Sequence, residues 1–365
     1  MASPKKKFLF VVQGEGRGHM TQSIAMQSII LNAGMEVCGV LIGKSPQRKI
    51  PDFYLEKIKA PITPIESPNF VTDAKMKSIR MFPSVVKNIQ NFGTFRNSLR
   101  IIDEKIKEYK PDVIVNFYDP LIGLYYLFNK PKIPMVCVAH QYLMNHPEFE
   151  FPKGFLMDRI SLKFYTNLTA HGATKRLALS FYPFQDSERE HVYVIPPLLR
   201  DEVFSQKPTA GNYILVYLVN SGYLEDIIAW HEKNSEVEVH CFIDKKSEHD
   251  VEQFHDKLFF HKINDQKFLA MMAGAKGLVS TAGFESVCEA MFLGKPVFMV
   301  PVEGHFEQYC NSRDAFKAGA GIYDKGFHIT RFLNYLAGYR NTSDNFKNWV
   351  NQSPNKTIEQ LKSVL

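Results

Sequence analysis

Residues 277–321 decide the fold of this chain, and they read GLVSTAGFESVCEAMFLGKPVFMVPVEGHFEQYCNSRDAFKAGAG. A short apolar run at 277–279 stops at the small residues Thr281-Ala282-Gly283, and residues 284–292 then repeat apolar side chains at helical spacing. A second apolar run over 297–302 leads to another helical segment that opens near His305. This alternation predicts two strand–turn–helix units of a parallel sheet.

The turn before the first of these helices is suited to binding an anion. Ligands of open α/β sheets bind at the edge where such turns lie, and a helix N-terminus offers free N–H groups and partial positive charge to a phosphate. Glu289 lies one and a half turns inside the helix, where its carboxylate can bind two hydroxyls of a sugar ring. The next turn adds the polar or flexible residues Gly304, Glu307, Gln308 and Asn311. The residues alone fit equally well an ordinary Rossmann-like half with Glu289 on a solvated helix face.

The order of these residues resembles a known signature. The stretch contains, in order, a small residue and glycine, Ser286, Glu289-Ala290, Gly294-x-Pro, an apolar strand and Glu-Gln-x-x-Asn. This order is similar to the donor-nucleotide signature of GT-B glycosyltransferases. The nearest branch is the family 28-like one, typified by the peptidoglycan N-acetylglucosaminyltransferase. The resemblance implies an α/β fold, GT-B, with two Rossmann-like doubly wound domains facing a central cleft. It also implies that Gly283 and Ser286 contact the donor phosphates and that Glu289 binds the ribose, with Thr281 as a further donor-binding residue. Phe284-Glu285 departs from the family pattern, since an acid beside a phosphate is unfavourable.

The bulk composition is that of a globular protein. The chain has 365 residues, enough for two domains, with 45% hydrophobic and 22% charged residues. Five cysteines without C-x-x-C spacing favour free thiols over a disulfide or zinc framework. The apolar run at 8–12 is too short for a signal-peptide core, so a cytoplasmic protein is expected.

Positive charge is concentrated in the first half. Residues 1–198 contain 26 Lys and Arg and 17 Asp and Glu, a net charge of 26 − 17 = +9, within a total of +6. A basic half can face an anionic acceptor or an anionic membrane surface, although an ordinary solvated surface explains it equally. Nucleic acid is not expected as a partner, because the basic residues are scattered and no binding module is present.

The N-terminus repeats the strand–turn–helix pattern. Residues 8–12, FLFVV, predict a buried strand, which the glycine loop 13–19, QGEGRGH, joins to a helix. A P-loop is excluded because Gly18-His19-Met20 stands where Gly-Lys-Ser/Thr is required, and a dinucleotide fingerprint lacks its third glycine and its acid. The loop is similar to the Gly-x-Gly-His loop of GT-B glycosyltransferases. That resemblance places Gly16 and Gly18 on the acceptor side of the cleft.

Two residues are candidates for the catalytic base. Inverting transfer requires that the acceptor hydroxyl lose its proton as it attacks, and a histidine such as His19 suits that task. His19 can instead cap the helix or bind the donor phosphate. Asp119, which follows the predicted strand 112–117, can orient His19 or act as the base, and a turn-forming Asp-Pro explains it as well. His140 and Gln141 follow the strand 134–139 and are similar to a pair that borders the acceptor site in the family.

Residues 146–164 alternate apolar and basic side chains. Such a segment can lie in a bilayer interface and reach a lipid-linked acceptor, which would make the protein peripheral at the inner face of the membrane. A loop and helix packed on the core is the alternative that the sequence favours.

The domain boundaries follow from the proline-rich segment at 196–211. We predict an N-terminal acceptor-side Rossmann-like domain (1–198), a linker (199–211) and a C-terminal donor-binding Rossmann-like domain (212–340). Residues 341–365 form a last helix that, by resemblance, returns to the N-terminal domain. A second series of strands and helices begins at 213, and residues 323–338 are expected to be helical. The resemblance places Asn220 and Ser221 beside the donor phosphates and the backbone near Ile263 beside the base.

No Asp-x-Asp motif occurs in the sequence, so neither a metal ion nor another cofactor is expected. The first reading is therefore an inverting, metal-independent glycosyltransferase of the hexosyltransferase type. Its donor would be a nucleotide sugar, foremost a UDP-sugar, and its acceptor a hydroxyl of a glycan of the cell envelope, a lipid-linked compound or a small molecule. The second is a nucleotide-sugar 2-epimerase on the same fold, with Glu15, Asp119 or Glu285 as its acids. The third is a non-catalytic nucleotide-sugar binding protein.

Overall fold

A computed structural model of the protein describes residues 4–46, 48–67, 71–72, 79–80, 92–218, 221–243, 250–341 and 343–365. They divide into two compact units. As far as these ranges are described, the first comprises Met1–Val71, Met81–Arg200 and Trp349–Leu365, and the second comprises Thr72–Arg80 and Asp201–Asn348.

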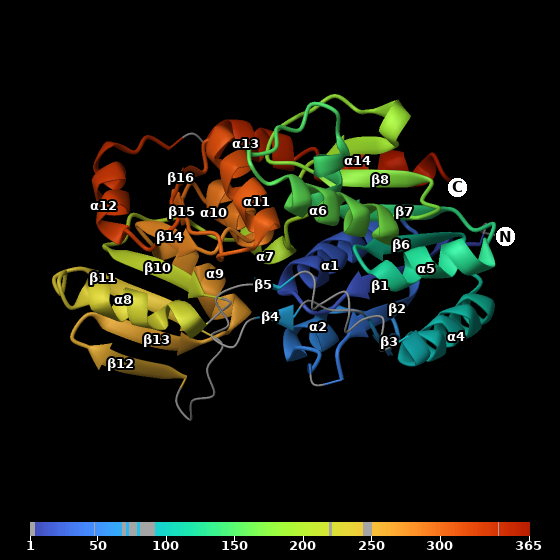
Figure 1. The fold of residues 1–365 in the computed structure, drawn as a ribbon, viewed down its shortest axis with the longest axis horizontal. Coiled ribbons are helices and arrows are strands. Elements are labelled where there is room, and N and C mark those ends of the chain that lie inside the picture. Colours follow the sequence, from blue (N-terminus) through green and yellow to red (C-terminus); the bar gives the residue numbers. More distant parts are fainter. Residues whose placement is uncertain are drawn as a thin grey trace. The chain divides into compact units, whose positions relative to one another are not determined.

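The first unit is built on a seven-stranded parallel sheet in the order β3-β2-β1-β6-β7-β8-β9 (Figure 1). Its central strands are apolar along almost their whole length because helices cover both faces of a parallel sheet. The strands are β1 (Lys7–Gln13), β2 (Glu36–Lys44), β3 (Ile62–Glu66), β6 (Val113–Phe117), β7 (Met135–Ala139), β8 (Lys175–Leu179) and β9 (Val192–Ile195). A separate two-stranded sheet pairs β4 (Val71–Thr72) with β5 (Ile79–Arg80), and all of it except Val71 belongs to the second unit.

The helices of the first unit connect these strands. They are α1 (Arg17–Asn32), α2 (Asp52–Lys57), α4 (Phe92–Tyr109), α5 (Pro120–Asn129), α6 (Leu156–Thr169) and the short 3-10 helices η1 (His140–Asn145) and η2 (Glu188–Glu190). Residues 349–365 at the end of the chain also belong to the first unit. They include the last residues of α13 (Ser343–Val350) and the whole of α14 (Ser353–Lys362). Trp349 Nε1–H donates to the carbonyl of Ser180 at 2.9 Å, and Lys175 Nζ donates to Gln360 Oε1 at 2.6 Å. These bonds fix residues 349–365 on the first unit.

The second unit repeats the plan with the order β12-β13-β11-β10-β14-β15-β16. All its pairs are parallel except that of β12 with β13, which is antiparallel at the edge. The strands are β10 (Tyr213–Leu218), β11 (Glu238–Ile243), β12 (Val251–His255), β13 (Leu258–Lys262), β14 (Gly277–Ser280), β15 (Val297–Met299) and β16 (Gly321–Tyr323). The helices are α7 (Asp201–Phe204), η3 (Ser221–Tyr223), α8 (Leu224–His231), α9 (Asp265–Gly274), α10 (Phe284–Phe292), α11 (Phe306–Lys317) and α12 (Ile329–Gly338).

A buried lysine ties the segment before β10 to this unit. Lys295 is 7% exposed, and its Nζ donates to the carbonyls of Thr209 and Ala275 at 2.5 and 2.8 Å. Burial lowers the pKa of this ammonium group. Residues 199–211 thus contain both the short helix α7 and a residue bonded to the core of the second unit.

Each sheet reverses its strand order once. In the first unit β1 lies between β2 and β6, and in the second β10 lies between β11 and β14. Ligands of doubly wound sheets bind beside such a reversal, outside the carboxyl ends of the strands. The first reversal therefore places the glycine loop beside the β6–α5 turn, and the second places the carboxyl end of β10 beside the turn 281–283.

Three elements differ from the sequence predictions. The helix expected over 323–338 begins only at Ile329, because residues 321–323 form the edge strand β16, which is too short to show a period. The strand expected over 297–302 ends at Met299. The residues that follow it, 300–302, lie in the connection between β15 and α11. The sequence also predicts a mostly helical segment over 79–109, but residues 79–80 form β5 and the described part of the helix begins at Phe92.

Candidate functional site

The glycine loop of the first unit joins β1 to α1. Gly14 N–H donates to the carbonyl of Gly43 at 2.7 Å, and a Cβ on Gly14 would approach that oxygen to 2.9 Å. Gly16 is the N-cap of α1 and has no side chain to bond the first turn, and Gly18 lies within that turn. Glu15 accepts a bond from the backbone N–H of Ser45 and so closes the loop onto the end of β2.

His19 lies in the first turn of α1 and is half-buried. Its Nδ1 is 3.1 Å from Gln22 Oε1, one turn further along the helix, and its ring stacks on Tyr118 at 5.4 Å between centroids. Because an amide oxygen only accepts, Nδ1 carries the proton and Nε2 holds the lone pair. Desolvation lowers the pKa of His19 to about 4, and the Gln22 bond opposes this shift. At neutral pH the ring is therefore uncharged and can accept a proton at Nε2.

Asp119 forms hydrogen bonds with the backbone at the start of α5 and with Asn116, and not with His19. It is the N-cap of α5, its Oδ1 accepts the N–H of Leu121 at 2.8 Å, and its own N–H donates to Asn116 Oδ1 at 2.9 Å. Its carboxylate packs on Gly43, where a Cβ would lie 1.9 Å from Oδ2. The residue is fully buried. Burial raises the pKa of Asp119 to about 7, against the opposing effects of the Leu121 N–H and the Ser67 hydroxyl.

Replacing Asp119 with asparagine should change how stability depends on pH. A carboxyl whose pKa rises on folding stabilises the protein fully below about pH 4, and this contribution is lost as pH rises towards 7. Asparagine keeps the helix cap and the shape but does not ionise. The variant should therefore gain stability relative to wild type between pH 4 and 7.5, on the order of 1–4 kcal/mol. Urea unfolding at four pH values measures this, and parallel profiles of the two proteins would contradict the raised pKa.

His140 and Gln141 begin η1 at the end of β7 and are buried. His140 Nδ1–H donates to the carbonyl of Leu179 at 2.7 Å, and its ring packs edge-on against Phe181. The carbonyl fixes the tautomer, with the lone pair on Nε2. These residues share the carboxyl edge of the sheet with the glycine loop, because β1, β6 and β7 are neighbours.

The turn 281–283 of the second unit has a strained backbone. Ala282 has a φ of 60°, in the left-handed region that alanine rarely adopts, and it is fully buried. Such strain is typical of binding sites. Gly283 is the N-cap of α10 and has no side chain that could cap the first turn of this helix. Ser286 Oγ donates to the carbonyl of Gly283 and lies 3.3 Å from Ser280 Oγ, and Thr281 is buried beside them.

Glu289 is not on a solvated face of α10. Its exposure is 4%, which excludes that alternative. The negative charges of Glu285, Glu289 and Asp314 all raise the pKa of Cys288, after the larger effect of burial, so three carboxylates surround this thiol. The acidic region therefore includes Glu285 in the first turn of α10 and Glu289 about one turn further along the helix.

The start of α11 closes against the same turn. His305 caps α11, its Nδ1 accepting the N–H of Gln308 at 3.5 Å, and Gln308 Oε1 accepts the N–H of Val302 at 2.9 Å. Asn311 Nδ2 donates to the carbonyl of Ala282 at 3.5 Å, and among the described residues its buried Oδ1 has no partner. Gly304, with a φ of 73°, and the half-buried Glu307 complete this turn.

Two residues of this site were missed by the sequence argument. Burial lowers the pKa of His305 to about 4, so the ring is neutral and can donate through Nε2–H. Tyr223, in η3, accepts the N–H of Glu303 at 3.2 Å and so connects the β10–α8 loop to the start of α11. Ser221 also lies in η3, whereas Asn220 lies outside the described residues. Ile263 is half-buried directly after β13.

Within the described ranges, no three His, Cys, Asp or Glu residues are placed to hold a metal ion together. None of the helices seen there combines the length and apolar character needed to cross a membrane. All five cysteines are buried free thiols.

Comparisons with known proteins extend over almost the whole chain. The model of glycosyl transferase family 1 matches residues 6–337. Among curated proteins, none matches the sequence.

Solved structures resemble both units together with their order in the chain. The calicheamicin glycosyltransferase CalG4 is 15% identical, with a TM-score of 0.65 over 99% of this chain and 98% of that chain. MurG of Acinetobacter baumannii is 14% identical, with a TM-score of 0.60 over 99% and 100%. LpCGTa, solved in complex with UDP, is 13% identical, with a TM-score of 0.65 over 99% of each chain. Identities this low show the fold, and they confirm the predicted α/β, two-domain GT-B class.

Proposed function

Since the chain belongs to glycosyl transferase family 1, it is a glycosyltransferase, and we propose that its donor is a UDP-sugar and its acceptor a hydroxyl compound. We further propose that transfer inverts the anomeric carbon and needs no metal ion. The observation that carries this proposal is the strained turn at Ala282 before the uncapped N-terminus of α10, beside the strand reversal of the second unit. The finer resemblance to the family 28-like branch stays a prediction.

The second unit binds the donor in this proposal. The N–H groups of α10, with Thr281, Gly283 and Ser286, hold the diphosphate, and Glu289 binds the ribose hydroxyls. The start of α11 faces the sugar. Further donor contacts come from Asn220, Ser221, Ile263, Gly304, Glu307, Gln308 and Asn311. The LpCGTa structure supports a uridine nucleotide, since that similar protein binds UDP.

The first unit supplies the base. Its most suitable group is His19, because Gln22 holds the proton on Nδ1 and leaves Nε2 free. As the acceptor oxygen bonds to the anomeric carbon, its proton passes to Nε2. The bond from that carbon to the phosphate oxygen breaks, and the nucleoside diphosphate leaves with the electron pair. Backbone N–H groups at the N-terminus of α10 stabilise the charge that develops on this leaving group, which is the work a metal ion does in other transferases.

Product analysis tests the reaction class. A transferase turns over a UDP-sugar productively only with an acceptor, whereas a 2-epimerase converts it alone and a binding protein converts nothing. The epimerase is disfavoured because two of its candidate acids have other roles: Asp119 is a buried helix cap and Glu15 holds the backbone of Ser45. Conversion of a UDP-sugar to its epimer in the absence of acceptor would contradict our proposal.

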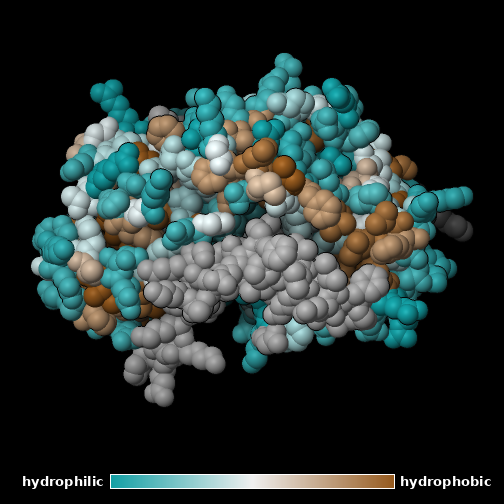
Figure 2. Space-filling model, viewed as in Figure 1, coloured by the Kyte–Doolittle hydropathy of each residue, from teal (hydrophilic) through white to brown (hydrophobic). Residues whose placement is uncertain are grey.

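We also propose that α6 contacts an anionic membrane surface. One face of this helix packs inward through Leu162 and Thr166, but its opposite face is exposed, contrary to a helix packed wholly on the core. Figure 2 shows hydrophobic surface gathered where α6 lies in Figure 1. The exposed α6 stripe consists of Leu156, Met157, Ile160 and Phe164, which are 53–72% exposed. Arg159 and Lys163 flank it, with their charges 4.5 and 5.5 Å from the ring centre of Phe151.

Changing all four residues of the α6 stripe to glutamine should weaken vesicle binding. Burial of one such side chain contributes about 1.5–3 kcal/mol, so losing the stripe should lower the partition coefficient by roughly 100-fold or more. Flotation with phosphatidylglycerol-containing vesicles measures this. The control variant carries Val251→Gln and Phe254→Gln, two exposed apolar residues of β12, and should bind as wild type does. Wild-type protein that stays with the unbound fraction would refute the membrane contact.

A further inference from the structure

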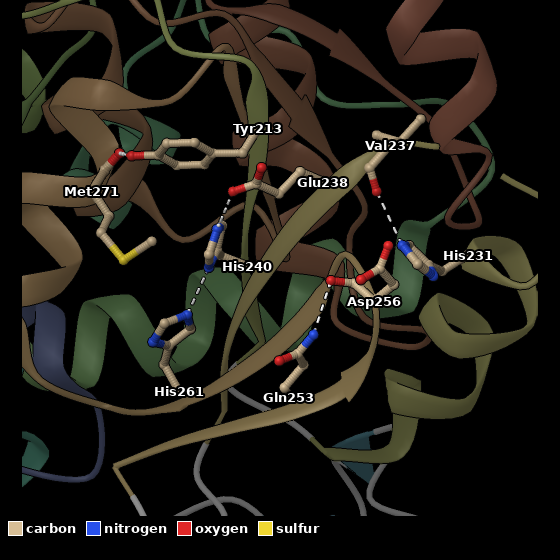
Figure 3. Close-up of polar contacts among 9 residues, drawn as sticks. All are labelled: Tyr213, His231, Val237, Glu238, His240, Gln253, Asp256, His261 and Met271. Carbon is tan, nitrogen blue, oxygen red and sulfur yellow. Dashed lines mark hydrogen bonds and ion pairs between the residues drawn. The ribbon is translucent and has the colours of Figure 1, made fainter. Parts of the chain in front are cut away.

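Three polar side chains form a chain of hydrogen bonds on one face of the second sheet. Glu238 and His240 alternate along β11, and His261 lies on the neighbouring strand β13. His240 Nε2 is 2.8 Å from Glu238 Oε1, and His240 Nδ1 is 2.9 Å from His261 Nε2 (Figure 3). Figure 3 also shows that the other ring nitrogen of His261 points away from His240.

The order of donors and acceptors fixes where the protons lie. A carboxylate only accepts, so His240 carries its proton on Nε2. In the arrangement with one proton on each ring, His240 Nδ1 accepts and His261 donates to it from Nε2. The lone pair of His261 therefore lies on Nδ1. This residue is 4% exposed, and among the described residues Nδ1 has no hydrogen-bond partner.

The two rings are held in place by aromatic neighbours. Phe259 stacks on His240 with 4.7 Å between centroids, and Phe242 stacks on His261 with 4.8 Å. Desolvation, assisted by Lys267 and His240, lowers the pKa of His261 to about 4, so Nδ1 keeps its lone pair at neutral pH. A buried acceptor without a donor costs about 1–3 kcal/mol, which a ligand that brings an N–H group would offset.

The strand register places His261 one residue before the carboxyl end of β13, next to the ligand-binding edge. His261 pairs with Phe242, Phe242 with Tyr217, and Tyr217 with Ser280, so the four residues form one row across the sheet. Ser280 is the last residue before the turn 281–283. Three strand spacings separate the two ends of the row, about 14 Å, which is comparable to the length of a nucleoside diphosphate. A nucleotide with its phosphates at α10 can thus bring its base towards the end of β13.

We propose that His261 Nδ1 accepts a hydrogen bond from the imide N–H of the donor's uracil, and that His240 and Glu238 are positioning residues that hold its tautomer. The inference rests on the proposed function and adds the means of base selection. Uracil presents a ring N–H to this acceptor. Cytosine presents a ring lone pair at the same position, which would face the lone pair of His261.

His231 provides a matched control in the same unit. It is 1% exposed, its Nε2–H donates to the carbonyl of Val237 at 3.0 Å, and its Nδ1 also lacks a partner among the described residues. It ends α8 and bonds the residue before β11, so it lies at the amino edge of the sheet, opposite the ligand-binding edge. A nucleotide at the carboxyl edge should leave it unaffected.

The test combines imidazole nitrogen-15 spectra with calorimetry. In the free protein, His261 should show a protonated Nε2 and a bare Nδ1, and saturation with UDP should shift the Nδ1 signal of His261 but not that of His231. His261→Phe should weaken UDP binding roughly 10-fold. Wild type should bind 3-methyluridine diphosphate and CDP about as weakly as His261→Phe binds UDP. Glu238→Gln, which retains the acceptor oxygen, should bind UDP as wild type does, and Glu238→Leu should bind more weakly.

The outcomes separate this inference from the function on which it rests. Equal affinity for UDP and for 3-methyluridine diphosphate would overturn the inference. A His261 Nδ1 that is protonated in the free protein would also overturn it. Either result would leave the glycosyltransferase proposal standing. Failure of every nucleoside diphosphate to bind wild type would overturn both. If His261→Phe does not fold, the spectra and the methylated nucleotide on wild type still decide the question.

Discussion

Replacing His19 with alanine is expected to lower turnover by about 100-fold or more, with the affinity for the donor nucleotide little changed. The acceptor hydroxyl is a poor nucleophile until a base removes its proton, and His19 Nε2 is the free lone pair that the glycine loop presents. Turnover with a saturating acceptor, compared with UDP affinity by calorimetry, separates loss of the base from loss of donor binding. Near-normal turnover would show that His19 is not the base. It would favour the alternative roles, which are capping of α1 or binding of the donor phosphate.

The pH profile gives a second test of His19. Because desolvation lowers its pKa to about 4, the neutral base is present at all higher pH values. The acidic limb of kcat/KM should therefore lie near pH 4 to 5 and not near the ordinary histidine value of about 6.5. Gln22→Glu places a negative charge beside the ring and should move this limb to higher pH. Gln22→Leu leaves the tautomer free and should lower kcat more than it changes KM.

Replacing Glu289 with alanine is expected to weaken binding of the nucleoside diphosphate roughly 10- to 100-fold. Hydrogen bonds from ribose hydroxyls to a carboxylate contribute about 1.5–3 kcal/mol, which corresponds to that range of affinity. Glu289 is nearly enclosed, so its carboxylate is held close to one position in α10. Calorimetric titration with UDP measures the change.

A matched variant shows whether the effect on UDP is specific. Glu289→Gln keeps the shape and one acceptor but loses the charge, and it should fall between wild type and alanine. Thermal unfolding of both variants detects a general loss of structure at this buried position. Equal affinities for UDP in all three proteins would show that the ribose lies elsewhere and that the motif was placed on the wrong helix.

Much of the fold could be predicted from local patterns. Buried parallel strands are mostly apolar, so 8–12, 112–117 and 277–279 stand out, and turn-forming residues follow their carboxyl ends. Very short elements could not be predicted in this way. The three residues of β16 become a strand only because β15 offers a free edge, and that is a property of the assembled sheet.

The candidate site was predictable where its residues are near each other in sequence. The turn 281–283, Glu289 and the start of α11 belong to one stretch of chain, and Gln22 was within reach, three residues after His19. Contacts between distant segments were not predictable. Asp119 packs on Gly43 through the pairing of β1 with its two neighbours. His240 meets His261 only because of the register between β11 and β13.

Calorimetric titration of the wild-type protein with UDP, GDP, TDP and NAD, with and without magnesium, tests the central claim most directly. The account predicts that UDP binds selectively and with the same affinity whether magnesium is present or not. Binding of NAD alone, or of none of the four, would contradict the claim that the turn before α10 is the donor site of a glycosyltransferase.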